Sequence, residues 1–164
     1  MVYVSMFRVN TGGLKYLWTA IGYPSKENPD EDRDFKLTGL GGYGVNYMDP
    51  EIAFDQMSKV DIYFGRTVVK PLEHIVISLD ESIKTNKDAC VIADKIACIY
   101  KNEHQLIWAV REYKNSQYQI NIIINSVRIH DGKLFRSGFN EMYHLYPHVR
   151  KITNQSARIQ YKSI

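Results

Sequence analysis

The stretch that most constrains the fold covers residues 118–129, "YQINIIINSVRI", where apolar and polar side chains alternate with the two-residue period of a β-strand. One face would carry Ile120, Ile122 and Ile124. The other face would carry Gln119, Asn121, Ile123 and Asn125. A strand with one strongly apolar face must bury it against another layer. The chain is therefore expected to contain a sheet with a core on one side, and the amide side chains on the other side need an explanation.

The rest of the chain predicts the element order β-α-(α)-β-α-β-β-α. Alternating residues predict strands over 1–9, 73–81, 104–113 and 120–129, with a last short strand over 134–138. Apolar residues at helical spacing predict helices over 12–23, 49–65, 85–103 and 140–153, the last broken near Pro147. The glycine-rich segment 35–47 is expected to be irregular. The fold class is α+β, with a mainly antiparallel sheet and helices packed on one face.

At 164 residues the chain is expected to form one domain over 1–164, long enough to fold without a disulfide or a structural metal. The net charge of +3 does not by itself imply a nucleic-acid partner, although the last third is basic enough to follow a phosphate backbone. The first nine residues lack the long apolar segment and the cleavage site of a signal peptide, and no apolar run is long enough to span a bilayer, so neither a signal peptide nor a membrane span is expected. A cytoplasmic protein without a membrane partner is the expectation.

The strands predicted over 104–113 and 120–129 would form a hairpin, because only a short polar turn separates them. If this hairpin folds about residues 114–116, Glu112 would lie near Gln119 and Asn121. A carboxylate and two amide oxygens suit a hard cation such as Mg²⁺ or Mn²⁺ better than Zn²⁺. Spacing alone leaves a second interpretation open, in which all three are solvent-facing strand residues.

Several segments together resemble the plasmid mobilisation relaxases, a family of HUH endonucleases. The matching segments are "GVNYMDPEIAFDQMSKVDIYFGR", "HIVISLDE" and "HQLIWAVREYKNSQYQINIIINSVRIHDGKLF". The resemblance covers most of the chain, and the combination is specific although no single segment is. It implies a relaxase-like, HUH-type catalytic domain.

In that family the third motif reads H-x-D-x-x-x-x-H-x-H, and its three histidines bind a divalent metal that polarises the scissile phosphate. Placed on this chain, the histidines fall on Glu112, Gln119 and Asn121, and the aspartate falls on Lys114. All three ligands are changed, so the metal motif is degenerate. Either these three residues hold Mg²⁺ or Mn²⁺ weakly, or metal binding is lost and the fold only binds DNA.

The resemblance also implies a tyrosine nucleophile on an N-terminal helix, which attacks a DNA phosphodiester and leaves a 5′-phosphotyrosine. Tyr16 matches that position, and Tyr23 is the second choice. His74 lies on the polar side of its predicted strand and would contact the phosphate or support the metal. Without the resemblance, Tyr16 would be interpreted as a core or rim residue and His74 as a half-exposed strand residue.

Two functional hypotheses follow from the resemblance. The first is a metal-assisted DNA relaxase that nicks one strand of plasmid or mobile-element DNA at an origin of transfer and so starts conjugative mobilisation. Its partners would be single-stranded DNA and relaxosome accessory proteins. The second is a catalytically inactive, relaxase-like DNA-binding module; a sheet protein unrelated to DNA is a third possibility. The chain is either a fragment of a longer relaxase or a minimal stand-alone protein.

Overall fold

A computed structural model describes residues 1–9, 13–29, 31–66, 72–135 and 139–159. The strands are β1 (Val2–Val9), β2 (Phe35–Tyr43), β3 (Leu72–Ser78), β4 (Leu106–Tyr113), β5 (Tyr118–Asn125) and β6 (Ala157–Ile159). The helices are α1 (Gly13–Ile21), α2 (Pro50–Tyr63), α3 (Asn86–Ala97) and α4 (Phe139–Thr153). The six strands form one sheet in the order β2-β4-β5-β3-β1-β6. Every neighbouring pair is antiparallel except β1 and β6, so the predicted α+β class with a mainly antiparallel sheet is confirmed.

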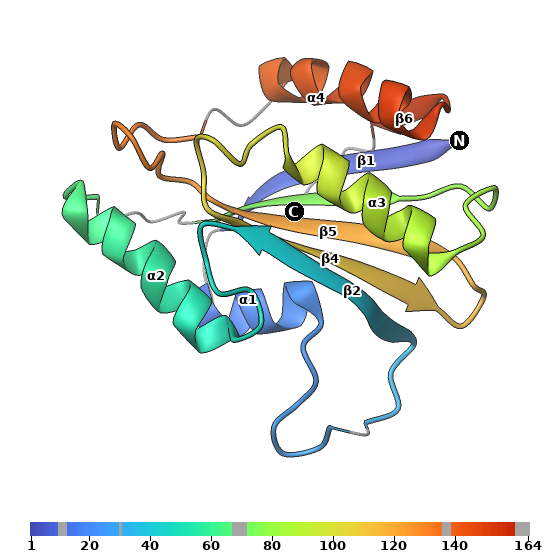
Figure 1. The fold of residues 1–164 in the computed structure, drawn as a ribbon, viewed down its shortest axis with the longest axis horizontal. Coiled ribbons are helices and arrows are strands. Elements are labelled where there is room, and N and C mark those ends of the chain that lie inside the picture. The colour runs from blue at the N-terminus through green and yellow to red at the C-terminus, as the bar shows by residue number, and fades with distance from the viewer. Residues whose placement is uncertain (10–12, 30, 67–71, 136–138, 160–164) are drawn as a thin grey trace.

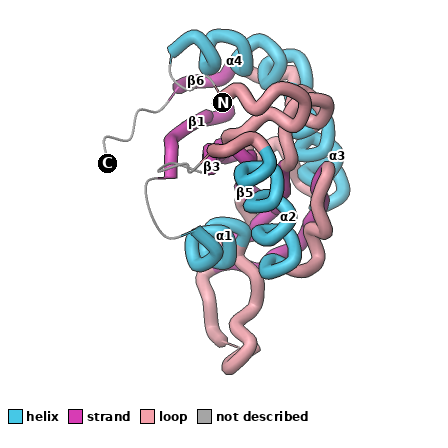
Figure 2. The backbone as a smooth tube through the Cα atoms, turned by 90° about the vertical axis from the view of Figure 1, so that its left-hand side faces the viewer, coloured by secondary structure: helices cyan, strands magenta, loops and turns pink. Residues whose placement is uncertain are grey.

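Helices cover both faces of the sheet (Figures 1 and 2). On the α3/α4 face, Ile120, Ile122 and Ile124 of β5 pack with residues of α3 and α4 such as Ile96 and Leu145 into the larger core. On the α1/α2 face, Ile107, Ala109 and Ile123 pack with apolar residues of the other two helices into a second core. The fold thus differs from the expected single helical layer. The reason is that β4 and β5 carry apolar residues on their second face too, and these also have to be buried.

Local sequence explains where the central helices begin. Asp49 accepts hydrogen bonds from the backbone N–H groups of Glu51 and Ile52, and Pro50 occupies the first turn of α2. The side chain of Thr85 caps α3 in the same way, through the N–H of Asp88. Within the described ranges, no helix is long and apolar enough to cross a bilayer.

The segment expected to be irregular contains the edge strand β2 instead. Its glycines make room for neighbours on the α3/α4 face: a Cβ at Gly41 would overlap the indole of Trp108, and one at Gly39 would overlap the sulfur of Cys90. Helix α4 runs through Pro147 without a break. In place of the last short strand, the structure has one isolated bridge between Val127 and Leu134, and residues 136–138 lie outside the described residues.

Candidate active site

A polar cluster lies on the α1/α2 face beside the second core, and four elements contribute to it. Helix α1 brings Tyr16, β3 brings His74, and β5 brings Asn121 and Gln119. On β4, Tyr113 completes the cluster. We call these five residues the polar relay, because hydrogen bonds connect all of them. Strand alternation places them together: His74 pairs with Ile123, two residues from Asn121 on the same face of β5.

The relay begins at the Tyr16 hydroxyl, whose oxygen lies 2.7 Å from Nδ1 of His74. The other ring nitrogen of His74, Nε2, lies 2.9 Å from Oδ1 of Asn121. The Nδ2 amide of Asn121 donates to Oε1 of Gln119 over 3.2 Å. The Tyr113 hydroxyl donates to that same Gln119 oxygen, also over 3.2 Å. An unbroken hydrogen-bonded chain therefore runs from the helix α1 phenol to the far end of the β4–β5 hairpin.

Burial controls the protonation of the first two groups. Only 5% of His74 is exposed, and this burial lowers the pKa of its imidazole to about 4, although the hydrogen bond to Asn121 acts in the opposite direction. Burial also raises the pKa of the Tyr16 phenol to about 12, an effect that the nearby positive charge of Arg111 partly offsets. At neutral pH the pair is thus a phenol hydrogen-bonded to a neutral imidazole.

Arg111 ties the C-terminal end of α1, the helix that carries Tyr16, to β4. Its guanidinium donates to the backbone carbonyl of Thr19 over 2.7 Å and also to the carbonyl of Ala20. It lies 4.3 Å from the centre of the Phe35 ring, a cation–π arrangement. The sequence analysis missed Arg111 and Tyr113, although their alternation with Ala109 on one strand would have placed them on this face.

The structure brings together four of the residues predicted from sequence: Tyr16, His74, Gln119 and Asn121. Tyr23 lies elsewhere: it is buried in the second core, and its hydroxyl donates to the backbone carbonyl of Tyr47. The exposed Lys114, which stands where the family has an aspartate, pairs with Asp32 over 3.2 Å.

Glu112 is not part of the cluster. It pairs with Tyr118 across the hairpin, and Tyr118 packs into the core on the α3/α4 face. Cross-strand partners share a face, so Glu112 lies on the opposite side of the sheet from Gln119 and Asn121. Arg111 is the residue that pairs with Gln119. The carboxylate of Glu112 therefore does not converge with the amide oxygens of Gln119 and Asn121, contrary to the expectation from sequence.

The residues present do not fit the divalent metal that the resemblance implies. Without Glu112, the donors at the expected position are two neutral amide oxygens, and amides are weak ligands. Both oxygens already accept hydrogen bonds, Oδ1 of Asn121 from His74 and Oε1 of Gln119 from two donors. Over the described residues, there is no group of three His, Cys, Asp or Glu side chains that could hold a metal.

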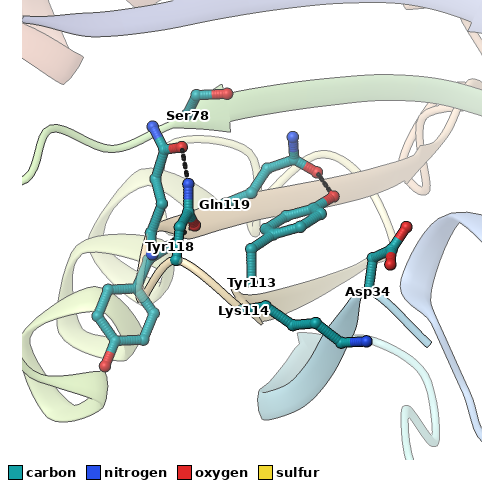
Figure 3. A pocket seen from close by; sticks show the side chains of 8 residues that line it. Asp34, Ser78, Tyr113, Lys114, Tyr118 and Gln119 are labelled. Carbon is teal, nitrogen blue, oxygen red and sulfur yellow. Dashed lines mark hydrogen bonds between the residues drawn. The ribbon is translucent and has the colours of Figure 1, made fainter. Parts of the chain in front are cut away.

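A pocket of about 510 Å³ adjoins the relay at its hairpin end, lined by Tyr113, Gln119, Ser78, Asp34 and Lys114 among others. Figure 3 shows the Tyr113 phenol reaching the Gln119 amide inside it. The backbone N–H of Lys114 donates to the carbonyl of Asp34, which ties the hairpin turn to the start of β2. The lining offers hydrogen-bond donors and acceptors together with aromatic surface next to Gln119.

A comparison with protein families identifies the domain. Residues 26–157 match the family described as relaxase, MobA/VirD2-like, nuclease domain. The chain belongs to this family. Relaxase domains bind single-stranded DNA at an origin of transfer and are generally metal-dependent, so membership supports a role in DNA nicking. The match includes His74, Gln119 and Asn121 but begins after Tyr16. The comparisons with curated proteins and with solved structures found no match.

Proposed function

We propose that this relaxase-family domain nicks single-stranded DNA and transfers the cut strand, with Tyr16 as the nucleophile. The observation that carries the proposal is the 2.7 Å hydrogen bond between the Tyr16 hydroxyl and the buried imidazole of His74. A phenol with a raised pKa is a weak nucleophile until a neighbouring group accepts its proton. Here such a group is in hydrogen-bond contact, within a domain of a nicking family.

The reaction is a transesterification at one phosphodiester. The Tyr16 oxygen attacks phosphorus, the bond from phosphorus to the 3′-oxygen breaks, and the 5′-phosphate remains on the tyrosine. The covalent link conserves the energy of the broken bond for later resealing. In a plasmid, cutting one strand at an origin of transfer in this way starts mobilisation. The pocket beside Gln119 is suited to one nucleotide of the strand, since it combines a phenol, an amide and a lysine.

The proposed step does not involve Mg²⁺ or Mn²⁺, because the donor set around Gln119 and Asn121 does not fit either ion. That same observation favours a second candidate function. A relaxase fold without its three metal histidines could serve as a DNA-binding module that does not cut. The two candidates differ in a single product, the covalent adduct between protein and DNA.

The test uses a randomised pool of single-stranded oligonucleotides with a fluorophore at the 3′ end, because the fragment that stays on the tyrosine keeps that end. Adducts are resolved on denaturing gels. We expect adducts with the wild type and with the control Tyr23→Phe, and a loss to below detection with Tyr16→Phe. Adducts on Tyr16→Phe would exclude Tyr16 as the nucleophile. Salt-dependent binding by the wild type without any adduct would support the binding module instead.

A further inference from the structure

The hydrogen atoms of the polar relay have one consistent arrangement. Oδ1 of Asn121 is a carbonyl oxygen and only accepts, so the hydrogen between it and His74 must be on Nε2. A neutral imidazole with its hydrogen on Nε2 has a free lone pair on Nδ1. The Tyr16 hydroxyl is therefore the donor in its bond to Nδ1.

The amides beyond His74 maintain this arrangement. If the side chain of Asn121 were flipped, its NH₂ group would face Nε2 and favour the other tautomer. In the structure, Nδ2 of Asn121 donates to Oε1 of Gln119. This hydrogen bond keeps Oδ1 of Asn121 directed toward His74. Gln119 is anchored in turn, because the Tyr113 hydroxyl donates to the same oxygen. Each member thus fixes the orientation of the one before it.

We infer that His74 accepts the proton of Tyr16 during attack on the phosphate, and that Asn121 and Gln119 position His74 for this step rather than bind a metal. The inference rests on the proposed function and adds how the nucleophile is activated. His74 is then a catalytic residue, because it touches a reacting atom. Asn121, Gln119 and Tyr113 are positioning residues, because they act through His74.

The step balances without a further reactant. The hydroxyl proton of Tyr16 passes to Nδ1 of His74 as the new oxygen–phosphorus bond forms. The electron pair of the broken bond stays on the departing 3′-oxygen, which takes a proton from water. The imidazolium formed meanwhile lies next to the anionic phosphate, and this pairing stabilises it in a site shielded from solvent.

The geometry also distinguishes this role from a metal-binding one. A cation held by Asn121 and Gln119 would have to replace the hydrogen bonds to His74 and Tyr113, and Glu112, the carboxylate expected to share the site, lies on the opposite face of the sheet. In place of a metal site, the two amides thus form a hydrogen-bonded support for His74.

The experiment measures the initial rate of adduct formation in the assay above, with EDTA or with Mn²⁺. The key variant is His74→Asn, whose amide keeps a hydrogen-bonding atom near the position of Nδ1 but takes no proton at neutral pH. The matched control is His104→Asn, which removes the other buried histidine of the described residues, whose Nδ1 lies 2.8 Å from the backbone carbonyl oxygen of Asn125. Circular dichroism verifies that each variant is folded.

We expect the wild type to form adducts at the same rate in EDTA as in Mn²⁺. Relative to the wild type, the rate should fall about 10²- to 10³-fold in His74→Asn and change less than threefold in His104→Asn. We expect Asn121→Leu to lower the rate at least tenfold and Asn121→Asp, which still accepts from Nε2, to restore it. Nitrogen-15 NMR of the wild type should show the Nε2–H tautomer of His74, and Mn²⁺ should not broaden its signals.

The outcomes separate the two proposals. No adduct from the wild type overturns the proposed function and this inference together. Adducts that need a metal, a wild-type rate in His74→Asn, or an Nδ1–H tautomer overturn the inference alone, and nicking by Tyr16 would remain.

Discussion

The two faces of the sheet are built from the same strands but carry different side chains. On the α3/α4 face, Ile120, Ile122 and Ile124 are fully buried under two helices. On the α1/α2 face, the neighbouring residues Gln119 and Asn121 belong to a hydrogen-bonded chain that reaches a tyrosine on a helix. We therefore expect substitutions at Ile120, Ile122 or Ile124 to affect mainly stability, and substitutions at Gln119 or Asn121 to affect mainly the proposed chemistry.

The largest effect is expected from Ile122→Ala on the α3/α4 face. The side chain is completely buried, and truncating it leaves a cavity that a packed core fills only in part. We expect the free energy of unfolding to fall by about 3–4 kcal/mol, measured by urea denaturation. The neighbouring variant Asn121→Leu should cost much less stability yet lower the adduct rate. If Ile122→Ala, assayed where it is folded, slowed adduct formation as much as Asn121→Leu does, the two faces would not be separable.

How far the sequence predicted this arrangement depends on whether a feature is local. Alternation placed His74 on the polar side of β3, and it placed Gln119 and Asn121 on the polar side of β5; helical spacing placed Tyr16 on α1. These are local properties, because each follows from the period of a single element. The register of β3 with β5 shows that the two polar sides coincide. The contact between Tyr16 and His74 joins residues 58 positions apart and needed the tertiary fold.

The position of Glu112, by contrast, is not a local property. Its face depends on the register of the β4–β5 hairpin, and a change of one residue in the register moves every side chain to the other face. The turn pairs Glu112 with Tyr118, a register that the polar residues between the strands did not reveal. The strand β2 was missed for another reason. Its glycines resemble a loop, but they are needed because Trp108 and Cys90 approach the backbone closely.

The second prediction concerns acid stability, an effect that arises on the α1/α2 face. The pKa of His74 is about 4 in the fold and near 6.5 in the unfolded chain, so between these values the unfolded chain binds more protons. Stability should therefore be complete above pH 6.5 and fall as the pH drops toward 4, by about 3 kcal/mol from this group. His74→Asn removes the contribution.

Denaturation at several pH values measures this difference between His74→Asn and the wild type. The wild type should lose more stability on acidification than the variant does, and His104→Asn indicates how much the other buried histidine contributes, since burial lowers the pKa of His104 as well. Parallel pH profiles for the wild type and His74→Asn would mean that His74 is accessible to protons in the fold, and the relay would lose its neutral imidazole.

The smallest effect is expected from Glu112→Gln, and this variant tests whether Glu112 takes part in a metal site. The side chain is partly exposed on the α3/α4 side, opposite the relay, so neutralising it should change stability by no more than about 0.5 kcal/mol. The adduct rate, with EDTA or with Mn²⁺, should match that of the wild type. Gln119→Leu, at the neighbouring aligned position of the family motif, should instead slow adduct formation, because it removes the acceptor for both Asn121 and Tyr113. If Glu112→Gln abolished a metal-stimulated rate, Glu112 would have to reach the α1/α2 face in the DNA complex. That result would support the three-ligand metal site of Glu112, Gln119 and Asn121, and the two faces could then no longer be treated as separate.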